Sequence, residues 1–418
     1  MSGRRRRGKV GIALAGGGPL GGIYEIGALL ALDEALKGVT LTACDVYVGV
    51  SSGAFVAAGL ANGISPREMH AMFILDRSHS DPFEPDLLLR PAFGEFARRL
   101  TRMPELMQAA AFAYFGTTPA RGLFESFARL TRGLPNGLFD NNPIASYMSR
   151  LFSQPGRTDD FRKLGCQLFV VATELDSGKS APFGSPGLDH VPISQAVKAS
   201  AALPGLYPPA CIDGRDYVDG AMKKTLHASV ALKAGAKLLI CINPLVPYDA
   251  ELAARSGAKP VHLAERGLVT VLSQTFRALI HSRMRVGMER YAREFPDADV
   301  VLFEPAQDDA VMFFANMFSY ADRRRLAQHA YRHTLAELRR RAGELEPVLA
   351  RHGVELDRAV LEGATPTPAK SRQAGGLWDS VEPLGKTLSE LEKALSREKS
   401  GRSQGGRRNA AKAAPSDA

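Results

Sequence analysis

Apolar runs and helix-like runs alternate at the start of the chain. Val10 to Leu14 and Val46 to Val50 are short, continuous apolar runs bounded by turn residues, a pattern typical of strands buried inside a sheet. Each is followed by glycines and then by a run typical of a helix, Ile23 to Leu36 and Ala54 to Leu60. Strands that alternate with helices in this way predict a parallel sheet with helices on both faces.

Later apolar runs extend the predicted sheet. Further strands are predicted at Gln167 to Thr173, Lys237 to Asn243 and Asp299 to Phe303. Ala210 to Val218 is predicted to form a hairpin, because the Asp-Gly pair in its middle is a strong two-residue turn signal. The predicted fold class is therefore α/β, with a mainly parallel central sheet flanked by helices, a helical insertion and a helical C-terminal extension.

The 418 residues can form one large domain with extensions, or two domains. The expected parts are a basic tail over 1–9, a main domain over 10–305 with a helical insertion at about 76–142, a helical extension over 306–363, and a stretch over 364–418 that holds a linker, a short amphipathic helix and a basic tail. The insertion is rich in aromatic residues, which suits either a lid over a site or a packed helical subdomain. Val311 to Phe318 is rich in Met and Phe and is open to the same two interpretations.

A serine lies at the tip of a predicted strand, turn and helix. Gly49-Val50-Ser51-Ser52-Gly53 follows one predicted strand and precedes a predicted helix, which is the context of a nucleophile elbow. In so tight a turn a neighbouring Cβ would clash, so Gly49 and Gly53 leave room for Ser51 to project. The following helix directs backbone N–H groups at the same place. Ser51 is therefore a candidate nucleophile.

Ala15 to Gly22 is a glycine-rich loop between a predicted strand and a predicted helix. The bare N–H groups of such a loop can hold a phosphate or a developing oxyanion. A nucleotide loop is the alternative, but the Gly-Lys-Ser/Thr ending of a P-loop is missing. The dinucleotide pattern also needs an acidic residue about twenty positions later, which Asp33 and Asp45 offer only loosely. The loop is therefore interpreted as an oxyanion site.

Tyr217-Val218-Asp219-Gly220 completes an ordered set of glycine loop, serine elbow and Asp-Gly. This set resembles the patatin-like phospholipases, a family of serine lipid acyl hydrolases. Val170 to Gly178 and Ala196 to Pro209 are also similar to stretches of that family. The resemblance covers roughly residues 9 to 245, and as a set the motifs are specific.

The resemblance implies a Ser-Asp dyad that works without histidine. Ser51 would be the nucleophile and Asp219 its general base. The backbone N–H groups of Gly16, Gly17 and Gly18 would form the oxyanion hole, and Gly49, Gly53 and Gly220 would support the elbow and the turn. No histidine or cysteine spacing in the chain suggests a metal site, so neither a metal nor a cofactor is expected.

The chain departs from the family's pattern at two places. Leu20 stands where the family often has a basic residue, so charge assistance from that side chain is absent. After its aspartate the family often has Gly-Gly and then Asn-x-Pro, whereas this chain has Gly220-Ala221 and then Lys223-Lys224-Thr225-Leu226-His227. Substrate contacts downstream of Asp219 therefore need not follow the family.

The chemistry can also be argued from the residues themselves. A serine hydroxyl is a weak nucleophile unless a base takes its proton. An ordinary aspartate, with a pKa of about 4, is a poor base at neutral pH, and burial would improve it by raising that pKa. The alternative is a triad, for which the order Ser51, Asp219, His227 is formally correct. His227 lies at the start of the helix-like run Leu226 to Leu232, however, where a histidine is more often packed or solvated.

The net charge of +9 is unevenly distributed. Arg4 to Lys9 holds five basic residues and 364–418 holds ten basic and six acidic ones, which leaves 38 of each sign between them. The basic character therefore belongs to the two tails. Such tails suit an anionic membrane surface, at about 1 kcal/mol per basic residue; a solubilising role and nucleic acid are the alternatives. We expect a membrane surface rather than nucleic acid, and the oligomeric state stays open.

The start of the chain imitates a signal peptide, because four arginines precede the apolar run Val10 to Ala15. That run is short and glycine-rich, and cleavage there would remove the strand that presents the glycine loop. No run of about eighteen uncharged apolar residues qualifies as a membrane span. The four cysteines are widely spaced, which is typical of buried thiols in a reducing compartment. We therefore expect a cytoplasmic protein that can lie at a membrane surface.

The resulting prediction is a lipid acyl hydrolase that cuts an ester through an acyl-enzyme on Ser51, with Asp219 as the base. The alternative is a catalytically silent protein that uses the same pocket and the basic tails to bind lipid or another polyanion. The intact set of serine, aspartate and glycines favours the enzyme. Phospholipids, lysophospholipids, glycerides, thioesters and small esters all present the same carbonyl, so the sequence does not select among them.

Overall fold

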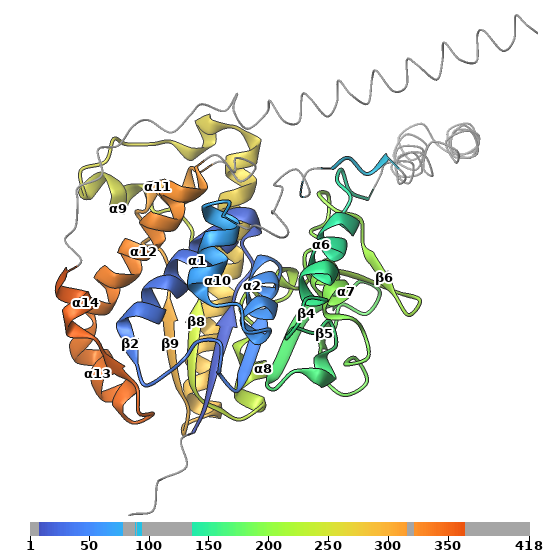
Figure 1. The fold of residues 1–418 in the computed structure, drawn as a ribbon. Helices are drawn as coiled ribbons and strands as arrows, with labels where there is room; N and C mark the ends of the chain where they lie inside the picture. The colour runs from blue at the N-terminus through green and yellow to red at the C-terminus, as the bar shows by residue number, and fades with distance from the viewer. Residues whose placement is uncertain (1–7, 78–87, 89, 94–135, 316–321, 364–418) are drawn as a thin grey trace, which may run out of the picture.

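The computed structural model describes residues 8–77, 88, 90–93, 136–315 and 322–363. Its centre is a mixed sheet of eight strands (Figure 1). The strands are β1 Lys9–Leu14, β3 Val46–Gly49, β4 Gln167–Glu174, β5 Ser180–Phe183, β6 Ala210–Ile212, β7 Arg215–Asp219, β8 Ala236–Ile242 and β9 Asp299–Phe303. They follow the order β6-β7-β4-β3-β1-β8-β9, with β5 also paired to β4. Two further short strands, β2 Leu36–Lys37 and β10 Glu355–Leu356, form a separate pair.

Five neighbouring strands of the sheet, β4, β3, β1, β8 and β9, run parallel. In the middle, Leu14 of β1 lies beside Gly49 of β3 and Ile242 of β8. β5 and β7 pair antiparallel with β4, and β6 pairs antiparallel with β7. The mainly parallel sheet is therefore confirmed. Because β1 and β3 run the same way, the loops that follow them leave the sheet at the same edge, where open α/β sheets build their sites.

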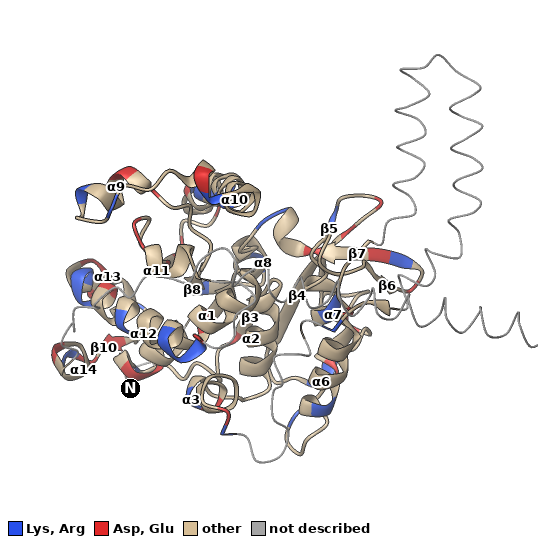
Figure 2. Cartoon of the chain, turned by 90° about the horizontal axis from the view of Figure 1, so that it is seen from above, with Lys and Arg blue, Asp and Glu red and all other residues tan. Residues whose placement is uncertain are grey.

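Helices cover both faces of the sheet (Figures 1 and 2). On one face lie α1 Gly18–Ala35, α2 Ser52–Ala61 and α12 Arg323–Arg340; on the other lie α8 Ala228–Lys233 and α10 Leu268–Glu294. Alternate residues of a strand point to opposite faces, so Ile12 of β1 packs with the first group and Ala13 with the second. The remaining helices and short helical turns are α3 Pro66–Met69, η1 His70–Ile74, α6 Asn142–Phe152, η3 Phe161–Lys163, α7 Ile193–Ser200, η4 Gly220–Met222, α9 Ala250–Arg255, η5 Leu263–Arg266, α11 Ala310–Phe313, α13 Ala342–Ala350 and α14 Arg358–Gly363.

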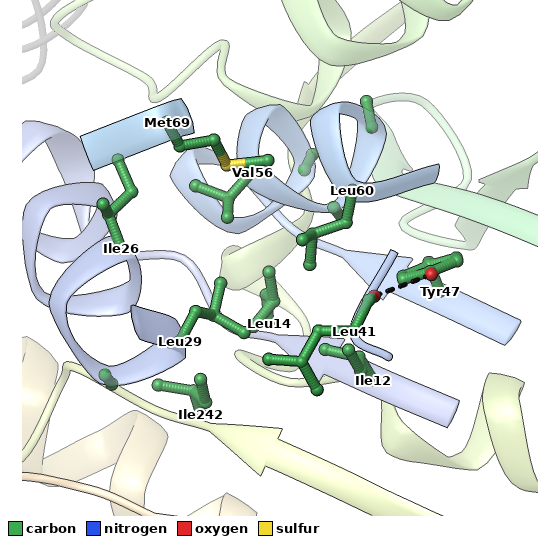
Figure 3. Close-up of a cluster of buried hydrophobic side chains, with 14 of the residues drawn as sticks. Ile12, Leu14, Ile26, Leu29, Leu41, Tyr47, Val56, Leu60, Met69 and Ile242 are labelled. Atoms are coloured by element: carbon green, nitrogen blue, oxygen red, sulfur yellow. Dashed lines mark hydrogen bonds between the residues drawn. The ribbon is translucent and has the colours of Figure 1, made fainter. Parts of the chain in front are cut away.

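The core between the sheet and helices α1 and α2 is closely packed (Figure 3). Ile12 of β1, Leu29 of α1 and Leu60 of α2 are wholly shielded from solvent and belong to one cluster. The polar group at its edge is satisfied, because the Tyr47 hydroxyl donates to the Leu41 carbonyl at 2.8 Å. Burying one such aliphatic side chain contributes roughly 1.5–3 kcal/mol. The cluster therefore fixes both helices, whose N-termini carry the glycine loop and the elbow.

The predicted strands are all present, and the hairpin of β6 and β7 turns at Asp213 and Gly214. Both turn residues have positive φ, 50° and 74°, as a tight hairpin turn requires. The first helix begins at Gly18, five residues before the predicted start, because Pro19 in its first turn supplies a helical φ without needing an N–H partner. Helix α10 was not among the predicted elements.

Other expectations have mixed outcomes. Within the Met- and Phe-rich run, Met312 and Phe313 are buried, which favours its interpretation as core. All four cysteines are free, but Cys211 is exposed on the edge strand β6, so the prediction of a buried thiol is wrong there. No helix in the described ranges is long and apolar enough to cross a membrane. Most of the predicted insertion, the amphipathic helix and nearly all of both basic tails lie outside the described residues.

Candidate active site

Ser51 lies in a strained turn between β3 and α2. Its backbone has φ 54° and ψ −123°, a conformation that a residue with a side chain adopts rarely and at a cost of about 1–3 kcal/mol. The turn is closed so tightly that a Cβ built on Gly49 would lie 2.4 Å from the Gly53 carbonyl oxygen. A Cβ built on Gly53 would lie 2.5 Å from the Ala15 carbonyl oxygen. The predicted nucleophile-elbow geometry is therefore present, and both glycines are required by close backbone approach.

Asp219 is brought to Ser51 by the sheet. It is the last residue of β7 and lies beside Ala172 of β4. Its carboxylate is buried and accepts a hydrogen bond from the Ala221 N–H at 2.8 Å, and the Ser51 hydroxyl lies near enough to interact with it. Burial raises the pKa of Asp219 to about 6, and the interactions with Ser51 and with the Ala221 N–H counter part of that rise. The structure thus joins a serine hydroxyl to a carboxylate that is more basic than an ordinary aspartate.

The glycine loop lies against the elbow. A Cβ built on Gly16 would lie only 3.0 Å from the Ser51 Cβ, so the loop backbone passes directly over the serine. Gly18 has φ 60°, in the left-handed region that favours glycine. The N–H groups of Gly17 and Gly18 face no acceptor among the described residues, as expected for the first turn of α1. These two N–H groups can serve as oxyanion donors.

The prediction for Gly16 as a third donor is not supported. Its single N–H donates to the Thr225 carbonyl at 3.3 Å, so it is already used in holding the loop. The side chain of Leu20, two residues after the glycines, is buried among apolar groups. Any oxyanion stabilisation from this loop therefore comes from two backbone N–H groups and the N-terminus of α1, without a side-chain charge.

Ser200 is a member of the site that sequence reasoning missed. It lies at the end of α7, and its hydroxyl accepts a hydrogen bond from the Ser51 N–H at 2.8 Å. The same hydroxyl donates to the Val171 carbonyl of β4 at 2.6 Å. Ser200 thereby ties the strained elbow to β4, the strand that pairs with β7 beside Asp219. Ser200 lies 149 residues from Ser51, and no local pattern marks it.

His227 does not take part in a triad. It is buried, with its backbone in the left-handed region at φ 46°. Its Nε2 lies 3.3 Å from the Gly220 carbonyl oxygen and donates to it. Among the described residues His227 has no hydrogen bond to Asp219 or Ser51. Burial lowers the pKa of His227 to about 4, so it is neutral at ordinary pH and braces the turn after Asp219.

The described residues hold no group of three His, Cys, Asp or Glu side chains close enough to bind a metal ion. The chemistry that these residues can perform is acid–base and nucleophilic. The Ser51 hydroxyl lies near the buried Asp219 carboxylate, and the glycine loop beside Ser51 holds unpaired N–H groups. A nucleophile, a base and oxyanion donors are the parts that acyl transfer needs.

This chain is similar to a known protein family and to several solved structures. The family model for patatin-like phospholipases matches residues 12–232, which include the glycine loop, Ser51 and Asp219. Among solved structures, VipD from Legionella pneumophila is 13% identical with a TM-score of 0.36, over 95% of this chain and 77% of VipD. The type III effector protein ExoU is 14% identical with a TM-score of 0.31, over 95% of this chain and 63% of ExoU. Full-length ExoU from Pseudomonas aeruginosa, solved with SpcU, is 16% identical with a TM-score of 0.26, over 80% of this chain and 53% of that one. The chain therefore spans less than two thirds of the length of ExoU.

Proposed function

We propose that this chain, which belongs to the patatin-like phospholipase family, hydrolyses carboxylic esters of lipids through an acyl-enzyme on Ser51. Membership of the family supports lipid hydrolase activity; the nucleophile, the base and the type of bond are our proposal. The observation that carries it is the closeness of a serine hydroxyl, held in a strained elbow, to the buried Asp219 carboxylate, whose pKa that hydroxyl lowers. Such strain is typical of functional sites.

The proposed reaction has two halves. In the first, Asp219 takes the proton of the Ser51 hydroxyl while Oγ attacks the ester carbonyl, and the Gly17 and Gly18 N–H groups stabilise the oxyanion. The intermediate collapses, and the leaving alcohol takes the proton from Asp219. In the second half a water gives its proton to Asp219 and attacks the acyl-enzyme. The fatty acid leaves and Ser51 regains its proton.

The physical case for a two-residue mechanism rests on burial. A base is most effective when its pKa lies near the working pH, and the pKa of Asp219 is raised to about 6. In a water-excluded site, one well-placed oxyanion donor stabilises the transition state by about 3–4 kcal/mol. With no imidazole beside Ser51, the backbone donors and the basic carboxylate have to supply most of the rate enhancement.

A burst experiment tests this function. With excess p-nitrophenyl butyrate, the full chain is expected to release one p-nitrophenolate per protein in a fast phase, followed by slower turnover, if deacylation is the slower half. Intact mass spectrometry of the quenched reaction should show the butyryl adduct. If the folded protein showed neither hydrolysis nor an adduct, with or without lipid vesicles, the result would favour the silent binding protein instead.

The pH dependence follows from the burial of Asp219. A buried carboxyl with a raised pKa is ionised only above that pKa, and only the ionised form can accept the Ser51 proton. Since the pKa of Asp219 is about 6, kcat/KM on a soluble ester is expected to rise about tenfold per pH unit below pH 6 and to level off above it. An acid limb nearer pH 4, where an unburied aspartate titrates, would contradict the account.

Replacing His227 by glutamine separates the dyad from the triad. The expected loss in kcat/KM is no more than about tenfold, because His227 braces the Gly220 carbonyl and glutamine can donate a similar hydrogen bond. The acid limb of the pH profile should stay in place, since it belongs to Asp219. A loss of about four orders of magnitude in a variant with unchanged circular dichroism would establish a triad.

A further inference from the structure

A partly enclosed cavity lies outside the candidate active site, between helix α10 and the segment that follows the Asp219 turn. Its volume is about 40 Å³, several times the space that one water needs. The residues around it include Lys223, Lys224, Ile280, Arg283, Met284 and Tyr291. Several of these residues belong to α10, which with α8 covers the sheet face opposite α1 and α2 (Figure 2).

Three cations surround the cavity: Lys223, Lys224 and Arg283. Within the described part of the chain no carboxylate forms an ion pair with any of them; Lys223 donates instead to the Gly178 carbonyl, at 2.8 Å. Partial burial and then the charges of Arg290, Lys233 and Lys223 lower the pKa of Lys224, and the smaller effect of Glu294 opposes them. The mouth of the cavity is therefore a concentration of positive charge that an anion would neutralise.

The inner wall of the cavity has one polar side chain without a partner. The Thr225 hydroxyl is buried, at 3% residue exposure, and makes no hydrogen bond. An unpaired buried hydroxyl costs free energy, but this oxygen has almost no accessible surface and so does not face the cavity. Around it the wall is apolar, formed by the buried side chains of Ile280, Met284 and Tyr291.

Helix α10 also presents an apolar surface outside the cavity. Leu279 and Val286 are 55% and 64% exposed. Leu279, Arg283 and Val286 follow the spacing i, i+4 and i+7, so all three lie on one face of the helix. A molecule whose head group contacted Arg283 would therefore lay an attached apolar chain along Leu279 or Val286.

We propose that this cavity binds the head group of an anionic amphiphile, with the oxyanion held by Lys224 and Arg283 and the apolar chain along α10. The site is separate from Ser51, and its occupancy does not depend on the proposed hydrolysis. The segment from Lys223 to His227 lines this site, and it is also where the chain departs from the pattern of its family.

The segment that lines the cavity is bonded to both halves of the candidate active site. The Thr225 carbonyl accepts from Gly16 of the glycine loop, and His227 donates to Gly220 beside Asp219. A bound amphiphile would therefore touch the segment that holds the oxyanion loop and the base in place.

Isothermal titration calorimetry of the full chain with dodecyl phosphate, kept below its micelle concentration, tests the proposal. The double variant Lys224→Gln/Arg283→Gln is expected to bind at least tenfold more weakly than wild type, because two charge-assisted hydrogen bonds are lost. Arg285→Gln, an exposed position on the same helix outside the cavity, is the matched control and should bind like wild type.

Three ligands distinguish an anionic amphiphile from a free anion: dodecyl phosphate, inorganic phosphate and dodecyltrimethylammonium. Dodecyltrimethylammonium, which has a similar chain but the opposite charge, should not compete. Inorganic phosphate should bind at least tenfold more weakly than dodecyl phosphate if the apolar chain contributes. Equal affinity for the two phosphates would assign the site to a free oxyanion and overturn the amphiphile. Equal binding of dodecyl phosphate by wild type and by the double variant would overturn the site itself. So would the finding that wild type does not bind dodecyl phosphate.

Discussion

Replacing Ser51 by alanine is expected to lower kcat/KM on a soluble ester by about four orders of magnitude or more. The hydroxyl is the proposed nucleophile, and removing the nucleophile from a serine hydrolase leaves only the rate supplied by the oxyanion donors and substrate binding. The variant should fold normally, because the elbow backbone is held by the Ser51 N–H bond to Ser200 and not by the hydroxyl.

Ser52 provides a matched control for that variant. It is the next residue, and its hydroxyl is buried without a hydrogen-bond partner. Ser52→Ala removes the same atom one position along the elbow and is expected to keep most of the activity. If Ser52→Ala lost the activity and Ser51→Ala kept it, the nucleophile would have been assigned wrongly.

Replacing Asp219 by asparagine is expected to lower kcat/KM by about three orders of magnitude, because the amide has nearly the shape of the carboxylate but cannot accept the Ser51 proton. The acid limb of the pH profile should disappear with it. Steady-state hydrolysis of a soluble ester between pH 5 and 8 would measure both effects.

Stability separates this loss from unfolding. Burial raises the pKa of Asp219 to about 6, so above that pH the folded protein carries a buried charge that the unfolded chain solvates freely. The protonated Asp219 carboxyl stabilises the fold in full below the pKa that this group has in the unfolded chain. That stabilisation is lost as the pH rises through about 6. At pH 7.5 the Asp219→Asn variant should therefore melt no lower than wild type. Asp216→Asn, an exposed position on the same strand, is the control and should keep its activity.

The features of the site that could be predicted from sequence are the local ones. The elbow at Ser51 needs glycines at fixed offsets, because a Cβ built on Gly49 would lie 2.4 Å from the Gly53 carbonyl oxygen. The hairpin before Asp219 is specified by an Asp-Gly pair with positive φ at both positions. Such requirements are imposed by residues a few positions away, so they are visible as motifs.

The features that could not be predicted depend on tertiary contacts. The Gly16 N–H is taken by the Thr225 carbonyl, a backbone contact across more than two hundred residues that no side-chain pattern records. The hydrogen bond from the Ser51 N–H to the Ser200 hydroxyl likewise joins two residues that are far apart in the sequence. His227 fits the chain order of a triad, but its ring is directed at the Gly220 carbonyl by the left-handed backbone at its own position.

Helix α10 escaped prediction for a different reason. Its polarity is partly inverted, since Arg277 and His281 are buried while Leu272 and Leu279 are exposed. An amphipathic pattern is recognised by apolar residues on one face, and here both faces carry apolar residues. Arg277 is accommodated in the interior by the Val246 carbonyl, to which it donates at 3.3 Å.

Fluorophosphonate labelling with intact-mass readout is the most direct test of the central claim, that Ser51 is a nucleophile activated by Asp219. The account predicts one adduct on wild type, located to Ser51 by peptide mapping. It predicts no adduct on Ser51→Ala and labelling slowed by about a thousandfold on Asp219→Asn. An adduct on another residue, equal labelling rates for wild type and Asp219→Asn, or no adduct on folded wild type in the presence of lipid vesicles would contradict it.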